Sequence, residues 1–286
     1  MTRAERLTRL GEGLFLGCLV LAFATPNAEA CCTNGVNSGN WDDSATWDQG
    51  VPGDTTRWFI RTFATNPIEV VIDSASDLPA GYTYGNSAVG GNDGGTANLI
   101  QSAGDMVLTD ELRLGDDFSL SSGTSGVYRI SGGSLLVSGS NMRMDPGVNS
   151  IFNVIGAGPT SITMDRLIMN SGSTLDFDIA ATGITPIDVL KRGGFNGTLD
   201  VDFDSFTPSV GTVYTLVNGN PNGTSFATFD ATADSLLGPD SIQLDLQIVD
   251  DGGPNEGVFV TVVPEPATLG MLAAAGAGLL IRRRRA

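Results

Sequence analysis

Short apolar runs that alternate with polar residues, each ended by Gly, Asn, Asp or Ser, fill the chain between residues 31 and 263. Runs of this kind are typical of β-strands joined by turns. No segment of this region has the apolar spacing of an amphipathic helix. The alternation is most regular at Leu199, Val201 and Phe203, and residues 175–179 and 242–248 alternate in the same way. These segments predict strands with one buried face and one wet face.

Three copies of a similar unit follow one another in the first half of the chain, spaced by roughly 24 to 30 residues. Each copy contains three short apolar runs, at residues 98–100, 106–108 and 112–114, then 128–130, 136–137 and 142–144, then 152–154, 162–164 and 167–169. Such a period is typical of a β-solenoid, whose stacked coils share one continuous core. A β-sandwich of hairpins is the alternative fold, because short strands with frequent turns suit both.

The first 30 residues have the three-part layout of a secretory signal peptide. Three arginines precede an apolar run, Leu14–Ala24, and the small residues Ala28 and Ala30 mark a cleavage site after Ala30. The run is short for a membrane anchor. We expect a signal helix that signal peptidase removes, which leaves Cys31 and Cys32 at the new N-terminus. Attachment of a lipid to Cys31 is an alternative fate.

The other end of the chain combines three features. A Pro-Glu-Pro motif at residues 264–266 is followed by an apolar run, Thr268–Ile281, and by four arginines at 282–285. A run of about 14 residues is marginal for a bilayer span. Arginines next to such a run stay in the cytoplasm. The pattern predicts a short transmembrane helix that is held from the cytoplasmic side, with a rigid proline joint outside.

This order of motif, apolar run and arginine cluster over residues 263–286 resembles the PEP-CTERM sorting signal of Gram-negative exported proteins. The resemblance implies transient anchoring in the inner membrane, cleavage by an exosortase-type transpeptidase, and delivery to the cell surface or the extracellular space. Exopolysaccharide is a further partner that the resemblance suggests. The resemblance assigns sorting roles to seven residues, Pro264, Glu265, Pro266, Arg282, Arg283, Arg284 and Arg285.

Two internal segments carry a related resemblance. Residues 40–54, with Trp41 and Trp47, are similar to the segment that opens many autotransporter-like surface β-helix proteins, and residues 123–136 resemble a repeat of PEP-CTERM proteins. We expect the two tryptophans to cover the open end of the solenoid core, because large aromatic side chains contribute most by burial. Stacking on a sugar is the alternative role for Trp41 and Trp47.

These observations divide the chain into four expected parts, all-β except at its ends. They are a signal peptide at 1–30, a parallel β-helix or solenoid at 31–171, a distal β-rich module at 172–262, and the sorting signal at 263–286.

The composition excludes several classes of protein. The 286 residues contain no His, so a Ser-His-Asp triad, a Cys-His pair and a His-ligated zinc are ruled out. Residues 1–30 carry three arginines and three glutamates, and residues 264–286 carry four arginines and one glutamate. The segment between them therefore has eight basic and 28 acidic residues, a formal charge of −20 against −17 for the whole chain. Such a surface repels nucleic acid and anionic lipids, so we expect no nucleic-acid partner.

The best candidate for chemistry is a set of aspartates that share one face of two expected strands. If these strands are neighbours, their carboxylates lie close together and repel unless a hard cation sits among them. A weak Ca²⁺ site is one hypothesis, and a solvated face that protects the sheet is the alternative; no other cofactor is expected. The candidate ligands are Asp176, Asp178, Asp200, Asp202 and Asp204. A second acidic segment, 250–256, lacks the EF-hand spacing and is expected to be an exposed turn.

Catalysis finds little support in the pattern. Some β-helices cleave polysaccharides with paired carboxylates, but no such pair stands out here. Arg113 and Arg143 occupy equivalent positions in consecutive copies, which a repeat explains without catalysis. We therefore expect an exported, non-enzymatic protein of the cell surface or extracellular matrix. A glycan-binding adhesin and a polysaccharide-acting enzyme are the alternatives, and an enzyme predicts a cleft made by a loop that breaks the repeat.

Overall fold

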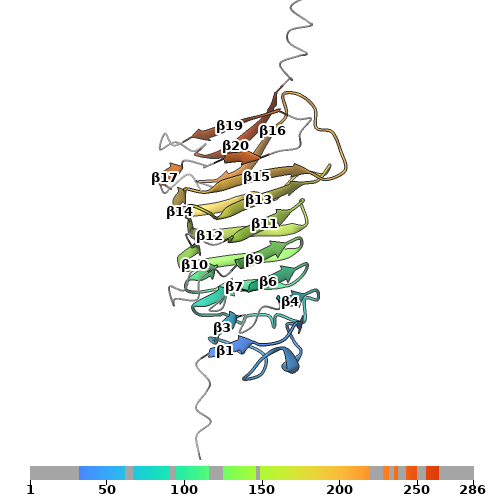
Figure 1. Cartoon of the computed structure of the whole chain (residues 1–286), viewed down its shortest axis with the longest axis vertical. Helices are drawn as coiled ribbons and strands as arrows, with labels where there is room; N and C mark the ends of the chain where they lie inside the picture. Colours follow the sequence, from blue (N-terminus) through green and yellow to red (C-terminus); the bar gives the residue numbers. More distant parts are fainter. Residues whose placement is uncertain are drawn as a thin grey trace, which may run out of the picture. The chain divides into compact units, whose positions relative to one another are not determined.

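The structure, a computed structural model, describes part of the chain: residues 32–61, 67–90, 95–115, 125–145, 149–219, 228–231, 235–237, 243–249 and 256–263. Within these residues the regular elements are β-strands and one short 3₁₀ helix, η1 (Ser44–Thr46). The strands form two sheets that wind around a common core as a parallel β-solenoid (Figure 1). The all-β prediction and the solenoid prediction are both confirmed.

The strands of the described residues divide between an eight-strand sheet and a twelve-strand sheet. The eight-strand sheet contains β2 (Gly39–Asn40), β4 (Ile68–Ile72), β6 (Thr96–Gln101), β9 (Ser125–Ile130), β11 (Ile151–Ile155), β13 (Thr174–Ile179), β15 (Thr198–Phe203) and β18 (Ser235–Leu237). The twelve-strand sheet contains β1 (Cys32–Gly35), β3 (Arg57–Ile60), β5 (Ser87–Val89), β7 (Asp105–Leu108), β8 (Leu112–Leu114), β10 (Gly133–Met144), β12 (Pro159–Met169), β14 (Ile187–Phe195), β16 (Val213–Asn218), β17 (Thr228–Ala231), β19 (Gln243–Val249) and β20 (Gly257–Val263).

Equivalent residues of successive coils lie side by side in parallel register. In the eight-strand sheet one such column is buried throughout, and it consists of Leu99, Tyr128, Phe152, Leu175 and Leu199. Each residue of the column comes from the next coil along the chain. This parallel stacking excludes the β-sandwich alternative, in which hairpin-connected neighbours would be antiparallel.

The twelve-strand sheet turns a corner within each coil. The first part of β10 pairs with β7 and its last part pairs with β8, with an irregular register between Val137 and Asn141. Gly139 lies in this interval with a φ of 89°, a conformation that glycine adopts without strain. Its backbone N–H donates a hydrogen bond of 2.7 Å to the carboxylate of Asp165 on the next coil. The three apolar runs of each predicted unit are therefore the three sides of one coil.

Neighbouring coils approach closely at the Ser-Gly-Gly turn of the predicted repeat. A Cβ atom built on Gly132 would lie 2.0 Å from the backbone carbonyl oxygen of Ser102, far inside contact distance. One coil further on, a Cβ on Gly158 would lie 2.0 Å from the carbonyl oxygen of Ser131. Glycine is required at these turns because the backbone of one coil rests on the backbone of the next.

An aromatic cluster fills the core at the first coils. Trp41 is fully buried and lies 4.9 Å from Trp47, 5.2 Å from Trp58 and 5.7 Å from Tyr84, measured between ring centroids. The indole N–H of Trp47 donates a 2.8 Å hydrogen bond to the backbone carbonyl of Trp41. Edge-to-face packing of this kind adds to the stabilisation from burial. Both tryptophans are thus buried in the core at the first coils, as the expected covering role requires.

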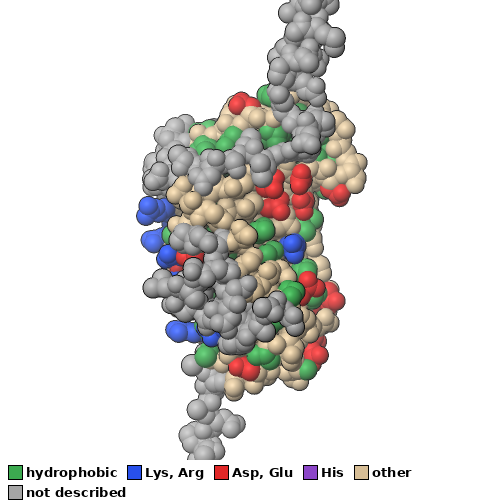
Figure 2. All heavy atoms as spheres, in the orientation of Figure 1, with side chains coloured by type: hydrophobic (Ala, Val, Ile, Leu, Met, Phe, Trp, Pro, Cys, Tyr) green, Lys and Arg blue, Asp and Glu red, His purple; other side chains and the backbone are tan. Residues whose placement is uncertain are grey.

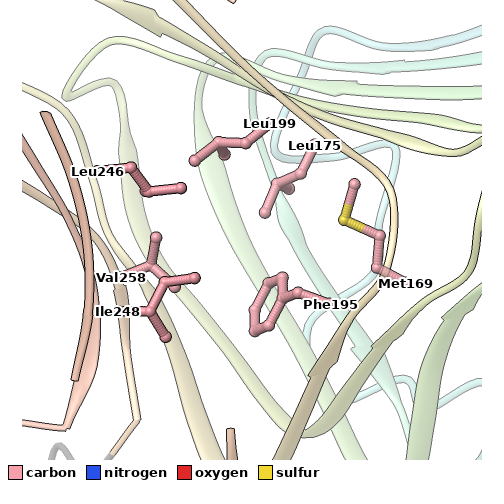
Figure 3. A pocket seen from close by; sticks show the side chains of 7 residues that line it. All are labelled: Met169, Leu175, Phe195, Leu199, Leu246, Ile248 and Val258. Atoms are coloured by element: carbon pink, nitrogen blue, oxygen red, sulfur yellow. The ribbon is translucent and has the colours of Figure 1, made fainter. Parts of the chain in front are cut away.

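The strand direction changes near the other end of the solenoid. Strand β20 pairs antiparallel with both β16 and β19. Figure 3 shows side chains of β19 and β20 facing side chains of the last coils across a small apolar void of about 10 Å³. Its lining residues are Met169, Leu175, Phe195, Leu199, Leu246, Ile248 and Val258. A void of this size holds at most one water, so it is a packing seam and not a ligand pocket.

The expected boundary at residue 172 falls inside the parallel stack. Strand β13 pairs in parallel with β11 before it and with β15 after it, so the coils continue into the region that was expected to form a distal module. The alternating pattern of Leu199, Val201 and Phe203 therefore belongs to a coil of the solenoid. The antiparallel arrangement begins with β16 and β20.

The expected signal helix at 1–30, Cys31 and the sorting segment at 264–286 lie outside the described residues. Among the residues that are described, no helix has the length and apolar character that crossing a membrane requires.

Candidate functional site

The five predicted aspartates do come together on the outer surface of the eight-strand sheet. Asp176 on β13 is the register partner of Asp200 on β15, and Asp178 is the partner of Asp202. Asp204 follows directly after β15, and its backbone N–H continues the ladder by bonding the carbonyl of Ile179 at 2.9 Å. Figure 2 shows acidic side chains gathered over this part of the solenoid. We call these five residues the acidic ladder.

The ladder forms where it does because of strict alternation. Leu175, Phe177 and Ile179 are fully buried, so the residues between them must point outward. The same alternation holds for Leu199, Val201 and Phe203. Parallel register then places the aspartates of one coil beside those of the next, at the ordinary spacing of adjacent strands, about 4.8 Å. The condition set by the sequence, that the two strands be neighbours, is met.

Crowding of like charges perturbs the ladder. Burial, followed by the neighbouring charges of Asp178, Asp200 and Asp202, raises the pKa of Asp176 to about 7, and Arg129 opposes this shift. Burial, together with the charges of Asp202 and Asp178, also raises the pKa of Asp200. One carboxylate oxygen of Asp176 is buried without a hydrogen-bond partner among the described residues. The ladder therefore carries charge repulsion that Arg129 offsets only in part.

The part of the acidic ladder at the carboxyl ends of β13 and β15 lines a shallow hollow. Asp178, Asp202 and Asp204 contribute to it together with Ile155, Phe203 and Ser205, and its volume is about 530 Å³. Asn153 donates a 3.2 Å hydrogen bond from its side-chain amide to Asp178, and the hydroxyl of Ser205 donates one of 2.8 Å to Asp204. The hollow is thus an open surface with acceptor groups on one side.

The geometry does not support the calcium hypothesis for these aspartates. Within the described residues no group of three or more Asp, Glu, Cys or His side chains is placed to hold a metal ion. Carboxylates in a strand ladder stand in parallel rows, whereas a calcium ion needs six to eight oxygens converging on one point. The arrangement fits the alternative interpretation, an acidic face in contact with solvent.

A second charged feature lies on the other sheet and was missed from the sequence. Arg166 on β12 is the register partner of Arg192 on β14, and both side chains are exposed. Neither forms an ion pair with another described residue. We call these two residues the basic ladder. The two arginines are separated in the sequence by the length of one coil. A search of the sequence for charges that recur at this spacing would have identified them.

Other basic residues surround the basic ladder, but each has an acidic partner. Lys191 contacts the carboxylate of Asp165 at 2.6 Å. Arg113 and Arg143, which the repeat predicted to be equivalent, are register partners and contact Glu111 at 2.8 Å and Asp145 at 2.5 Å. Five of the eight basic residues between 31 and 263 thus lie on β8, β10, β12 and β14, and Figure 2 shows Lys and Arg along one edge of the solenoid. Arg113 and Arg143 thus occupy equivalent positions of consecutive coils, and each lies in an ion pair.

Two further interpretations from the sequence change with the structure. Trp41 is fully buried and Trp47 is 4% exposed, so neither has a face open for stacking on a sugar. Glu256 was expected in an exposed acidic turn, but it is fully buried beside the start of β20. Its backbone carbonyl accepts a 2.8 Å hydrogen bond from Gly219, which fixes it against β16. The rest of that turn, residues 250–255, lies outside the described residues.

The C-terminal segment of the chain matches a known family model. Residues 262–285 match the family model described as the PEP-CTERM protein-sorting motif. The predicted sorting signal is therefore confirmed, and it marks the chain as an exported protein sorted by an exosortase to the cell surface. Comparison with curated proteins and with solved structures gives no significant match.

Proposed function

We propose that the mature protein is a non-enzymatic structural component of the cell surface or extracellular matrix. The observation that carries this proposal is the combination of the sorting motif at 262–285 with a solenoid whose described coils stack in parallel from β1 to β15. Such a solenoid repeats its outer faces from coil to coil, which suits a protein that acts through its surface.

The described side chains favour this function over an enzyme. The acidic ladder is a row of like charges, and three further acidic residues, Glu111, Asp145 and Asp165, are partners of Lys and Arg. The hollow at the acidic ladder contains carboxylates and a hydroxyl, but the described chain brings no basic side chain to its lining. The two tryptophans that an adhesin would use for sugar stacking lie in the core.

The experiment uses cells that produce the protein and lack its own copy, complemented with the wild-type chain or with Pro264, Glu265 and Pro266 replaced by Ala. We expect wild-type protein in the washed surface or matrix fraction, and the variant as uncut precursor in the inner membrane. Purified mature protein should release no new reducing ends from the exopolysaccharide of the same cells. Release of the wild-type protein into the medium, or catalytic formation of reducing ends, would overturn the proposal.

A further inference from the structure

We propose that the mature protein assembles side by side with further copies of itself, with the acidic ladder of one copy docked on the basic ladder of the next. This association depends on the two charged ladders of the solenoid. It does not depend on where the protein is delivered.

The two ladders match in period. Arg166 and Arg192 lie one coil apart, as do Asp176 and Asp200. Because neighbouring strands are about 4.8 Å apart in both sheets, the positive and the negative rows have the same repeat. Strands β12 to β15 follow one another in the chain, so both ladders also lie at the same level along the solenoid.

The two ladders lie on different sheets. The arginines project from the twelve-strand sheet and the aspartates from the eight-strand sheet, each from the outer surface. Two copies that stand side by side in the same direction therefore present opposite charges to each other without sliding along the solenoid axis. A contact between two different surfaces is heterologous, and it leaves one free ladder at each end of the pair. Such contacts build open rows rather than closed dimers.

Docking reduces the repulsion between like charges that each ladder has in a single copy. Like charges directly opposite each other on neighbouring strands are destabilising, and both ladders consist of such pairs. The neighbouring charges of Asp178, Asp200 and Asp202 add to burial in raising the pKa of Asp176, and Arg129 of the same chain offsets only part of that rise. A second copy brings arginines to the aspartates and aspartates to the arginines, so one type of contact relieves both rows.

A polyanion, such as an acidic polysaccharide, is the other ligand that the basic ladder could bind. It would neutralise only the arginines, and it would have to approach a segment with a formal charge of −20. A copy of this chain carries the same overall repulsion but neutralises both ladders. Charge complementarity therefore favours the second copy.

The overall negative charge predicts a characteristic salt dependence. At about 0.01 M salt the Debye length is about 30 Å, so the repulsion between whole molecules acts at long range. At about 0.1 M it is about 10 Å, which screens this repulsion more than the close contacts. At about 1 M it is about 3 Å and the ladder contacts are screened as well. Assembly should therefore be greatest at intermediate salt.

The test measures the weight-average mass of the processed protein, isolated from the cells that produce it, by sedimentation across this salt range. One variant replaces Arg166 and Arg192 by Gln, and the other replaces Asp178 and Asp202 by Asn. Matched controls change exposed charges on the same two sheets outside the ladders, Arg57→Gln and Glu69→Gln. Circular dichroism and melting curves verify that every variant is folded.

We expect the wild type and both controls to at least double in mass at intermediate salt and to return to monomer at high salt. Each double variant alone should stay monomeric. An equimolar mixture of the two should form a one-to-one pair, because one variant keeps the acidic ladder and the other keeps the basic ladder. A wild type that is monomeric at every salt concentration, or double variants that assemble as the wild type does, would overturn the proposal. Assembly of the wild type only after addition of a soluble polyuronate would overturn it in favour of the polyanion.

Discussion

Asp176 on β13 lies directly opposite Asp200 on β15, with both carboxylates on the outer surface of the same sheet. This pairing follows from alternation along each strand and from a parallel register between coils, and both are required for the hydrophobic column beneath it. The repulsion between the two carboxylates is thus a consequence of a core that the solenoid needs.

The raised pKa of Asp176 predicts that stability falls as pH rises. The folded protein holds a proton on Asp176 up to a pKa of about 7, whereas the unfolded chain releases it near 3.8. The folded state therefore binds more protons between these values, and the free energy of unfolding decreases with pH across this window. Because the carboxyl is partly exposed, the loss is about 1–2 kcal/mol rather than the full linkage value. Thermal melts from pH 4 to 8 measure it.

Replacement of Asp176 by Asn should raise the melting temperature at pH 8 and flatten this pH dependence. Glu69→Gln is the matched control, because Glu69 is exposed on the same sheet outside the ladder. An unchanged pH profile in Asp176→Asn would show that the carboxyl is not perturbed in the folded protein.

Two buried tyrosines predict opposite outcomes for the same substitution. The Tyr128 hydroxyl donates a hydrogen bond to the side-chain oxygen of Gln101, whose amide donates bonds of 2.9 and 3.0 Å to the carbonyls of Gly104 and Ser134. Tyr128→Phe leaves a buried acceptor without this donor and should cost about 1–3 kcal/mol. The Tyr84 hydroxyl is buried beside Trp41 and meets no described partner with hydrogen-bond geometry, so Tyr84→Phe should cost much less. Equal losses in chemical denaturation would contradict the network.

The contact between coils at Gly132 gives a steric prediction. A Cβ there meets the carbonyl of Ser102, so Gly132→Ala should destabilise the fold by about 1–3 kcal/mol through overpacking. Gly194 on β14 has no atom within 4 Å of a built Cβ, and Gly194→Ala should be tolerated. Urea denaturation of the two variants measures the difference, and a neutral Gly132→Ala would show that the coils are more loosely stacked.

The aromatic cluster at the first coils should behave as core and not as a binding surface. Trp41→Ala removes a fully buried side chain and should cost about 3–5 kcal/mol. Soluble oligosaccharides should leave the tryptophan fluorescence of the native protein unchanged. Saturable quenching by a sugar, abolished in Trp47→Phe, would restore the sugar-stacking interpretation.

Calcium should act on the acidic ladder only as a screening ion. Its addition should change the melting temperature no more than magnesium at equal ionic strength, because the strand-borne carboxylates do not converge on one point. A saturable increase that is specific for calcium and absent in Asp178→Asn would contradict this.

The sequence predicted the solenoid because its columns repeat in residue type. Leu99, Tyr128 and Phe152 recur at spacings of 29 and 24 residues, and the core requires an apolar residue at each of these positions. The acidic ladder was predictable in the same way, on the condition that two strands were neighbours. The basic ladder was missed because it spans only two coils, with Asn141 and Thr228 at the equivalent positions of the coils on either side.

Other features depend on three-dimensional details that alternation does not encode. A strand pattern is the same for parallel and antiparallel neighbours, so the pairing of β20 with β16 and β19 was not distinguishable from further coils. The burial of Glu256 was unexpected because its neighbours in the sequence have the composition of an exposed turn. The bond between Tyr128 and Gln101 links two coils through side chains, and such a pair has no sequence signature.

The most direct test of the account is the intact mass and cell fraction of the endogenous mature protein. We predict a product that starts at Cys31, ends near Pro264–Pro266, and lies outside the inner membrane, in the surface or matrix fraction. Additional mass in hexose steps would show sugar attachment to this product. A protein that retains Arg282–Arg285 and stays in the inner membrane would contradict the account, because the solenoid would then be the outer part of an anchored membrane protein.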